Sequence, residues 1–195
     1  MFEDMNRDEA YKTLLKMVKN KNLIKHHLAC EAAMKALYKK LSPSQNPSDE
    51  EKWGIVGLLH DADYELSKNH PEKHTLILEE KIGKKLSPEV IYAIKSHNYI
   101  NSGVTPKSIM DWSIYCCDEL TGLIIACVLV SPAKKIAAVD SDFVLRKFNE
   151  PSFAKGANRK QILSCEDKLG IPSRDFIDIC LKAMQGIGTE LDKPS

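Results

Sequence analysis

Apolar residues recur at intervals of three and four along most of the chain, which is the spacing of helices with one buried face. Residues 7–18 (RDEAYKTLLKMV) and 22–41 (NLIKHHLACEAAMKALYKKL) show this spacing clearly. Alternation of apolar and polar residues, the pattern of a half-buried strand, does not extend over any useful length. The pattern therefore predicts an all-α chain.

Start and stop signals divide this pattern into separate helices. Ser48 followed by Glu51 has the form of a capping box that opens a helix running to His60. Two further helices are expected to begin at Ser87-Pro88 and at Thr105-Pro106. The second of them is expected to end at Ser131-Pro132. Shorter helices are expected over about 140–148, 158–169 and 173–185. We interpret residues 1–185 as a single-domain helical bundle and 186–195 as a flexible tail.

Composition changes this picture little. The chain has 195 residues, 43% of them hydrophobic and 28% charged, which is typical of one globular domain with its own core. A net charge of +1 gives no electrostatic reason to bind long nucleic acids. The longest apolar run, LIIACVLV, is shorter than a bilayer requires, and the N-terminal MFEDMNRDEA is acidic where a secretion signal is basic. We expect a cytoplasmic protein with no membrane partner.

The cysteines form no CxxC pair and lie among apolar residues, so we expect buried, reduced thiols. They are Cys30, Cys116, Cys117, Cys127, Cys165 and Cys180.

Three predicted helices carry a titratable side chain on an apolar face. His26 lies on the core-facing stripe of the second helix, whereas His27 lies on a mixed face and is not expected to be a ligand. His60 and Asp61 follow the apolar run WGIVGLL, and Asp118 lies in the middle of IYCCDELTGLIIA. A histidine on an apolar face is more often a satisfied core residue than a ligand, but a buried carboxylate must be paired. The partner is either a core Lys, Arg or protonated His, or a divalent cation that satisfies all four residues at once.

The order of a histidine, then His-Asp, then a distant aspartate resembles the HD-domain superfamily of metal-dependent phosphohydrolases. The resemblance covers about residues 20–130 and rests on IKHHLACEAAM, LLHDADYE and CCDELTGLI. DELTGLI, KFNEPSFAKGANR and the helices of 140–185 are also similar to a small bacterial subfamily of HD and HDIG-type proteins, whose members are described as predicted hydrolases without an assigned substrate. The resemblance implies an HD-type bundle that binds manganese, iron, zinc, nickel or magnesium through His26, His60, Asp61 and Asp118.

The number of ions stays open. In superfamily members with two ions, the resemblance implies that Asp61 bridges them and that His74 and His97 are ligands of the second. The chain has Asn98 where a doubled histidine pair would continue, and HDAD instead of His-Asp-Ile-Gly. His70 precedes Pro71 in a polar loop and is expected to be solvated.

The implied reaction is hydrolysis of a small nucleotide or related phosphate ester by a metal-activated water. Asp61, His74 and His97 are the candidate catalytic residues, and Glu65 is either a further acid or base or a surface residue. One alternative is a catalytically silent HD module that binds a nucleotide or a protein partner in signalling. Another is a metal-dependent enzyme with a non-phosphate substrate.

A basic segment supplies candidates for binding the anionic substrate. Lys147, Lys155 and Arg159 cluster in RKFNEPSFAKGANR, and arginine suits bidentate contact with phosphate. A solvated basic face explains the same residues without a ligand.

Overall fold

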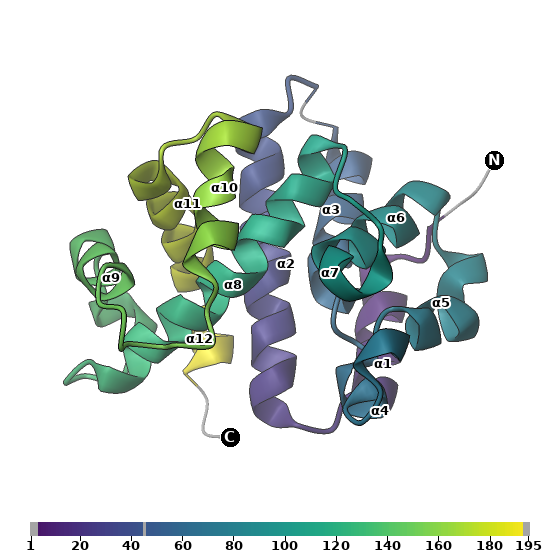
Figure 1. Cartoon of the computed structure of the whole chain (residues 1–195), viewed down its shortest axis with the longest axis horizontal. Coiled ribbons are helices and arrows are strands. Elements are labelled where there is room, and N and C mark those ends of the chain that lie inside the picture. Colours follow the sequence, from purple (N-terminus) through teal and green to yellow (C-terminus); the bar gives the residue numbers. More distant parts are fainter. Residues whose placement is uncertain (1–3, 45, 193–195) are drawn as a thin grey trace.

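The computed structural model describes residues 4–44 and 46–192, and in these residues all regular structure is helical (Figure 1). The longer helices are α1 (Arg7–Met17), α2 (Lys21–Leu41), α3 (Pro47–Leu59), α6 (Pro88–His97), α8 (Ile109–Val130), α9 (Ser141–Phe148), α10 (Arg159–Leu169) and α11 (Ser173–Gly186). The connections contain α4 (Tyr64–Ser67), η1 (Pro71–Lys73), α5 (Leu76–Ile82), η2 (Gly83–Lys85), α7 (Tyr99–Ser102), η3 (Ile136–Ala138) and α12 (Gly188–Leu191). The predicted all-α class is confirmed.

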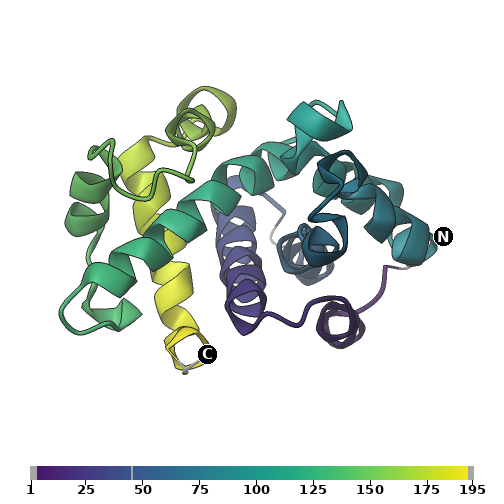
Figure 2. The same cartoon turned by 60° about the horizontal axis from the view of Figure 1, so that its bottom comes forward.

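Two long helices, α2 and α8, cross in the middle of the molecule. The first packs against α3, α8 and α11, and the second also packs against α6 and α10. Figure 2 shows α1 and α3 to α7 on one side of this crossing and α9 to α12 on the other. One contiguous core joins the two sides into a single compact fold.

The central position of α2 buries more of its surface than its pattern indicates. Its apolar stripe is buried as expected, with Ala33 and Leu37 fully enclosed. The stripe that we interpreted as mixed is also buried, and His27 on it is 0% exposed. The prediction for this face was wrong because α2 lies between three helices, which leaves little of its circumference for water.

A glycine allows α3 to approach α2 closely. A Cβ atom at Gly57 would lie 2.5 Å from the carbonyl oxygen of Cys30, in the backbone of α2. Because His60 follows less than one turn later, this approach also brings the end of α3 against α2.

Two helix starts differ from the expected positions. The side chain of Asn46, not Ser48, caps α3 and accepts a hydrogen bond from the Ser48 N–H. Ser108 opens α8 through a capping box with Asp111, three residues after the predicted start at Thr105. In both cases a nearby polar side chain accepts the unpaired backbone N–H groups better than the predicted cap does.

The C-terminal region is more ordered than expected. Residues 186–192 were predicted to be a tail, but α12 places Leu191 in the core at 6% exposure. The carboxylate of Asp192 accepts a hydrogen bond from the backbone N–H of Ile136 at 3.1 Å. The same prediction for 193–195 lies outside the described residues.

By length and composition, α8 is the one helix among the described residues that could cross a membrane. The sequence predicted no membrane-spanning helix because only LIIACVLV, a shorter apolar run within α8, was considered. In the fold, 61% of its most apolar window is buried, as in the core helix of a globular protein, and one such helix is weak evidence for a membrane span.

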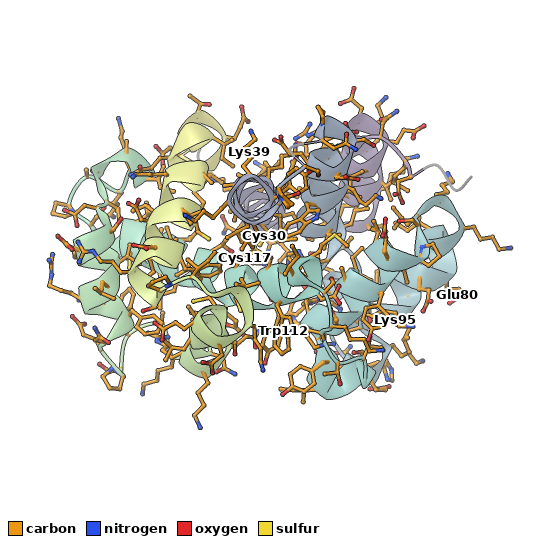
Figure 3. All side chains as sticks on the ribbon, turned by 90° about the horizontal axis from the view of Figure 1, so that it is seen from above. Cys30, Lys39, Glu80, Lys95, Trp112 and Cys117 are labelled. Atoms are coloured by element: carbon orange, nitrogen blue, oxygen red, sulfur yellow. The ribbon has the colours of Figure 1, made fainter. Side chains whose placement is uncertain are left out.

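The six cysteines are free and buried, as predicted. Figure 3 shows Cys30 and Cys117 between α2, seen end-on, and α8.

Candidate metal centre

The fold brings the predicted ligand residues together from separate elements. The positions are His26 within α2, His60 and Asp61 at the end of α3, His74 after η1, His97 at the end of α6 and Asp118 within α8. These side chains form two groups of ligand atoms that could hold a metal ion.

The first group surrounds Asp118. Its Oδ1 lies 3.0 Å from Nε2 of His26 and 3.4 Å from Nε2 of His60, and the two nitrogens are 3.2 Å apart. Oδ2 of Asp61 completes this side, at 3.9 Å from Nε2 of His26 and 3.8 Å from Nε2 of His60.

The second group uses the other oxygen of Asp61. Oδ1 lies 3.0 Å from Nε2 of His74 and 3.2 Å from Nε2 of His97. These nitrogens are 3.3 Å apart. The Asp61 carboxylate therefore lies between two histidine pairs, with one oxygen towards each.

The spacings within each group suit a metal ion. Ligand atoms about 2.0–2.1 Å from a cation lie about 2.8–3.4 Å from their neighbours in octahedral or tetrahedral coordination. The separations of 3.0 to 3.4 Å around Asp118 Oδ1 and Asp61 Oδ1 match this spacing, whereas Asp61 Oδ2 lies farther from the nitrogens of the first group, at 3.8 and 3.9 Å.

Hydrogen bonds at Nδ1 orient these imidazoles. Three Nδ1 atoms contact oxygens that can only accept: His60 contacts Gly57 O at 2.8 Å, His97 contacts Ile94 O, and His74 contacts Asp63 Oδ1 at 2.7 Å. Each of these Nδ1 atoms must therefore carry a proton, so the neutral ring presents a lone pair at Nε2.

The fourth imidazole is oriented in the same way through a hydroxyl. Oγ1 of Thr121 lies 3.3 Å from Nδ1 of His26 and donates its own hydrogen to the carbonyl oxygen of Asp118 at 2.9 Å. The hydroxyl oxygen is then free to accept from His26. Such partners on the far nitrogen are typical of metal-bound histidines.

Four Nε2 atoms thus face carboxylates, and this arrangement needs positive charge between them. In the protein without metal, protons supply it. Burial opposes protonation, yet Asp61 and Asp63 raise the pKa of His74 to about 9. Burial likewise opposes ionisation of Asp61, but His60, His74 and His97 hold its pKa well below the usual range. A divalent cation would replace these protons at the same positions.

The other carboxylate of the centre behaves like Asp61. Burial would raise the pKa of Asp118, but hydrogen bonds from His26 and His60 hold it below the ordinary range. Both carboxylates are therefore ionised and available as ligands.

Asp63 is a supporting residue that the sequence analysis missed. It is fully buried, and besides His74 it accepts hydrogen bonds from the backbone N–H groups of Thr75 at 3.1 Å and Leu78 at 2.9 Å. These N–H groups belong to the start of α5, so Asp63 caps that helix from a distant position. The only available signal was the second aspartate of HDAD, which we treated as a departure from the family pattern.

Two further side chains lie beside the centre. His27 packs its ring 5.3 Å from that of His60, and neither of its nitrogens has a hydrogen-bond partner among the described residues. Cys30 lies 3.9 Å from both ring nitrogens of His26 and 3.3 Å from Oγ1 of Thr121, and burial raises the pKa of its thiol well above the usual value. With His26, His60 and Asp118, Cys30 belongs to the group that could hold a metal ion.

The centre opens into two cavities. The larger, about 440 Å³, is lined by Asp61, His74, His97 and Asp118, and its size suits a small-molecule ligand. A second cavity of about 380 Å³ reaches His26 and Asp118 beside the loop after α9.

The structure gives Arg159 a role other than the predicted substrate contact. Its guanidinium donates to backbone carbonyls: Nη1 to Ala154 at 2.6 Å and Ala157 at 2.7 Å, Nη2 to Phe153 at 2.5 Å, and Nε to Phe148 at 3.3 Å. These contacts hold the loop between α9 and α10 in shape. The sequence shows the charge but not the direction in which the side chain points.

The other predicted substrate contacts also differ from one another. Lys147 pairs with Glu150 at 2.8 Å on the surface. Lys155 is exposed on the loop whose neighbouring residues, Ala154 and Gly156, line the second cavity. Its role in substrate binding stays a prediction.

The contacts of Glu65 and His70 bear on the roles predicted for these two residues. Glu65 accepts a hydrogen bond from the backbone N–H of Lys19 at 2.5 Å and does not line the larger cavity, which favours the surface residue over the further acid or base. His70 is exposed and contacts Glu72 at 3.2 Å, in agreement with the predicted solvated position.

Comparisons of the chain with known protein families, with curated proteins and with solved structures gave no match. The helical fold and the histidine–aspartate cluster are compatible with an HD domain.

Proposed function

We propose that the protein is a metal-dependent hydrolase, which cleaves a small nucleotide or related phosphate ester with a metal-activated water. The observation that carries this proposal is the position of Asp61. Its carboxylate lies between two histidine pairs whose Nδ1 atoms are anchored, and it faces a cavity that a small molecule can enter. Purely structural ion pairs do not require four anchored imidazoles to turn Nε2 towards two carboxylates, both of which line the cavity together with His74 and His97.

The two oxygens of Asp61 divide the ligands between two positions. Oδ2 would act with His26, His60 and Asp118 at one, and Oδ1 with His74 and His97 at the other. When bound, a divalent metal lowers the pKa of its water and polarises a phosphoryl oxygen. If only the first position is occupied, His74 and His97 stay free to transfer protons to or from the substrate.

The anionic substrate also needs support from the protein. Lys68 is the only lysine or arginine among the described residues that line the larger cavity. Its side chain is exposed and lines the same cavity as His74. Lys68 therefore replaces Arg159 as the leading candidate for charge pairing with the substrate.

Metal analysis combined with an activity panel tests the proposal. The full chain is purified without chelators, its metal content is measured, and phosphatase, nucleotidase and phosphodiesterase substrates are assayed with manganese, iron, zinc, nickel or magnesium. Asp61→Ala should lose metal and activity together, because it removes a ligand from both positions. His70→Ala is the matched control and should change neither, since His70 is exposed and pairs only with Glu72.

The outcomes separate the three hypotheses. Failure to retain or take up any of these metals would contradict the metal centre itself. Stoichiometric metal with ligand binding but no turnover would favour the catalytically silent module. Stoichiometric metal with no phosphate release and turnover of another substrate class would favour the non-phosphate enzyme.

A further inference from the structure

The rim of the larger cavity is apolar although its floor is polar. Tyr64 on α4 and Tyr99 and Ile100 on α7 line the cavity, and their exposed fractions are 51%, 37% and 72%. Large apolar side chains that stay exposed around a concave polar site are a recognised mark of a ligand contact. These side chains indicate a ligand that has an apolar part in addition to its charged group.

The tyrosines of this rim are held in place by their own packing. The ring of Tyr99 lies 5.5 Å from that of Tyr115, at an interplanar angle of 52°, and Tyr115 in turn packs edge-on to Trp112 at 5.6 Å. Tyr64 packs edge-on to His74, with ring centroids 6.0 Å apart. Fixed aromatic faces bind planar groups without the entropy cost of ordering a flexible side chain.

The same contacts show how near the rim is to the centre. Because Tyr64 packs against His74, and His74 lies 3.0 Å from Asp61, one imidazole separates Tyr64 from the Asp61 carboxylate. A phosphoryl group beside Asp61 would therefore leave the next part of the molecule against the tyrosines.

The charges of the lining limit the number of phosphoryl groups. Lys68 is its only lysine or arginine among the described residues, and neutral amides such as Asn98, Asn101 and Gln161 are among its other polar residues. Phosphoryl groups beyond the one at the metal centre would meet only Lys68 as a cation, on a wall that also holds Glu119. The lining therefore suits a single phosphoryl group.

From these observations we infer that Tyr64 and Tyr99 form a binding site for a planar aromatic group, so that the substrate is a phosphate monoester of an alcohol bearing such a group. This inference rests on the proposed function, because the phosphoryl group is assigned to the metal centre.

A pair of phosphonates, compared at an alkaline pH where both are dianions, tests the aromatic site without turnover, because the carbon–phosphorus bond is not hydrolysed. Binding of phenylphosphonate and ethylphosphonate to the manganese-loaded full chain is measured by calorimetry. Phenylphosphonate should bind about tenfold more tightly, which is within the range for stacking on an aromatic side chain. Tyr99→Ala should reduce this ratio to below about threefold, and Tyr99→Phe should preserve it, because the ring and not the hydroxyl makes the contact.

Controls separate a local effect from a general one. Tyr64→Ala should also reduce the ratio, whereas Leu129→Ala should not, because Leu129 is an exposed apolar residue of α8 (65%) outside the cavity lining. Equal binding of the two phosphonates, or a ratio unchanged in both tyrosine-to-alanine variants, would overturn the inference and leave the proposed function standing. Failure of both phosphonates to bind metal-loaded protein, with no phosphate ester hydrolysed, would overturn both.

Discussion

The substitution Asp63→Asn probes the support of the metal centre without removing a ligand. Asparagine has the same shape as aspartate, but one of its two terminal groups is an NH₂ group, which cannot accept a hydrogen bond. Oδ1 of Asp63 accepts from Nδ1 of His74 and from the N–H of Thr75, and Oδ2 accepts from the N–H of Leu78. At least one of these donors must therefore lose its partner inside the core.

The magnitude follows from that loss. Removing one hydrogen bond to a buried charge and leaving its donor unsatisfied costs about 2 kcal/mol. For a chain of this size, that lowers the melting temperature by about 4–8 °C. The asparagine also removes the negative charge behind His74, so the affinity of the second metal position should fall about 10- to 100-fold.

The assay is a manganese titration followed by calorimetry, together with thermal unfolding in chelator. The affinity of the position that uses His26, His60 and Asp118 should change less than that of the position that uses His74. Asp142→Asn, an exposed acid that pairs with Arg174 on the surface, is the control and should leave both unchanged. Wild-type affinity at both positions, with an unchanged melting temperature, would refute the assigned role of Asp63.

Three other predictions follow from the contacts described above. Without metal, the pKa of His74 is raised from 6.5 to about 9, so its protonation stabilises the fold fully below about pH 6.5, by at most about 3 kcal/mol, and this contribution is lost as the pH rises through 9. Melting temperatures in chelator should therefore fall across this interval while metal affinity rises, and a flat profile would contradict the pairing of His74. Arg159→Ala should lower stability by about 1–3 kcal/mol and increase proteolysis of the loop between α9 and α10, with metal content unchanged. Arg159→Lys should not restore the loop, because lysine lacks the planar set of donors; full recovery would show that charge alone matters. Gly57→Ala should separate α3 from α2 and reduce both stability and metal content, because the added carbon would meet the carbonyl of Cys30 at 2.5 Å. Gly122→Ala, where the added carbon meets nothing within 4 Å, should leave the melting temperature equal or higher, and equal effects of the two substitutions would refute the close approach.

Much of the fold could be predicted because helix formation depends on neighbours a few residues apart. The apolar spacing of residues 22–41 and the Pro88 start signal depend on contacts within one or two turns, and both agree with the observed helices. The helix starts that were wrong, at Ser48 and Thr105, were each displaced by a competing polar residue two or three positions away.

The sequence by itself determined the helical class and named the residues of the candidate metal centre, because polar side chains on apolar faces are conspicuous and their order resembles a known pattern. Only the tertiary structure decided how these residues act. Asp61 lies between two histidine pairs because α2, the end of α3, the segment after η1 and the end of α6 converge. Asp63 supports His74, which is eleven residues away, and also accepts from the N–H of Leu78, which is fifteen residues away. The direction of Arg159 is likewise set by a loop whose shape no short-range pattern encodes. Burial and side-chain direction depend on packing between distant segments, and linear spacing carries no information about those contacts.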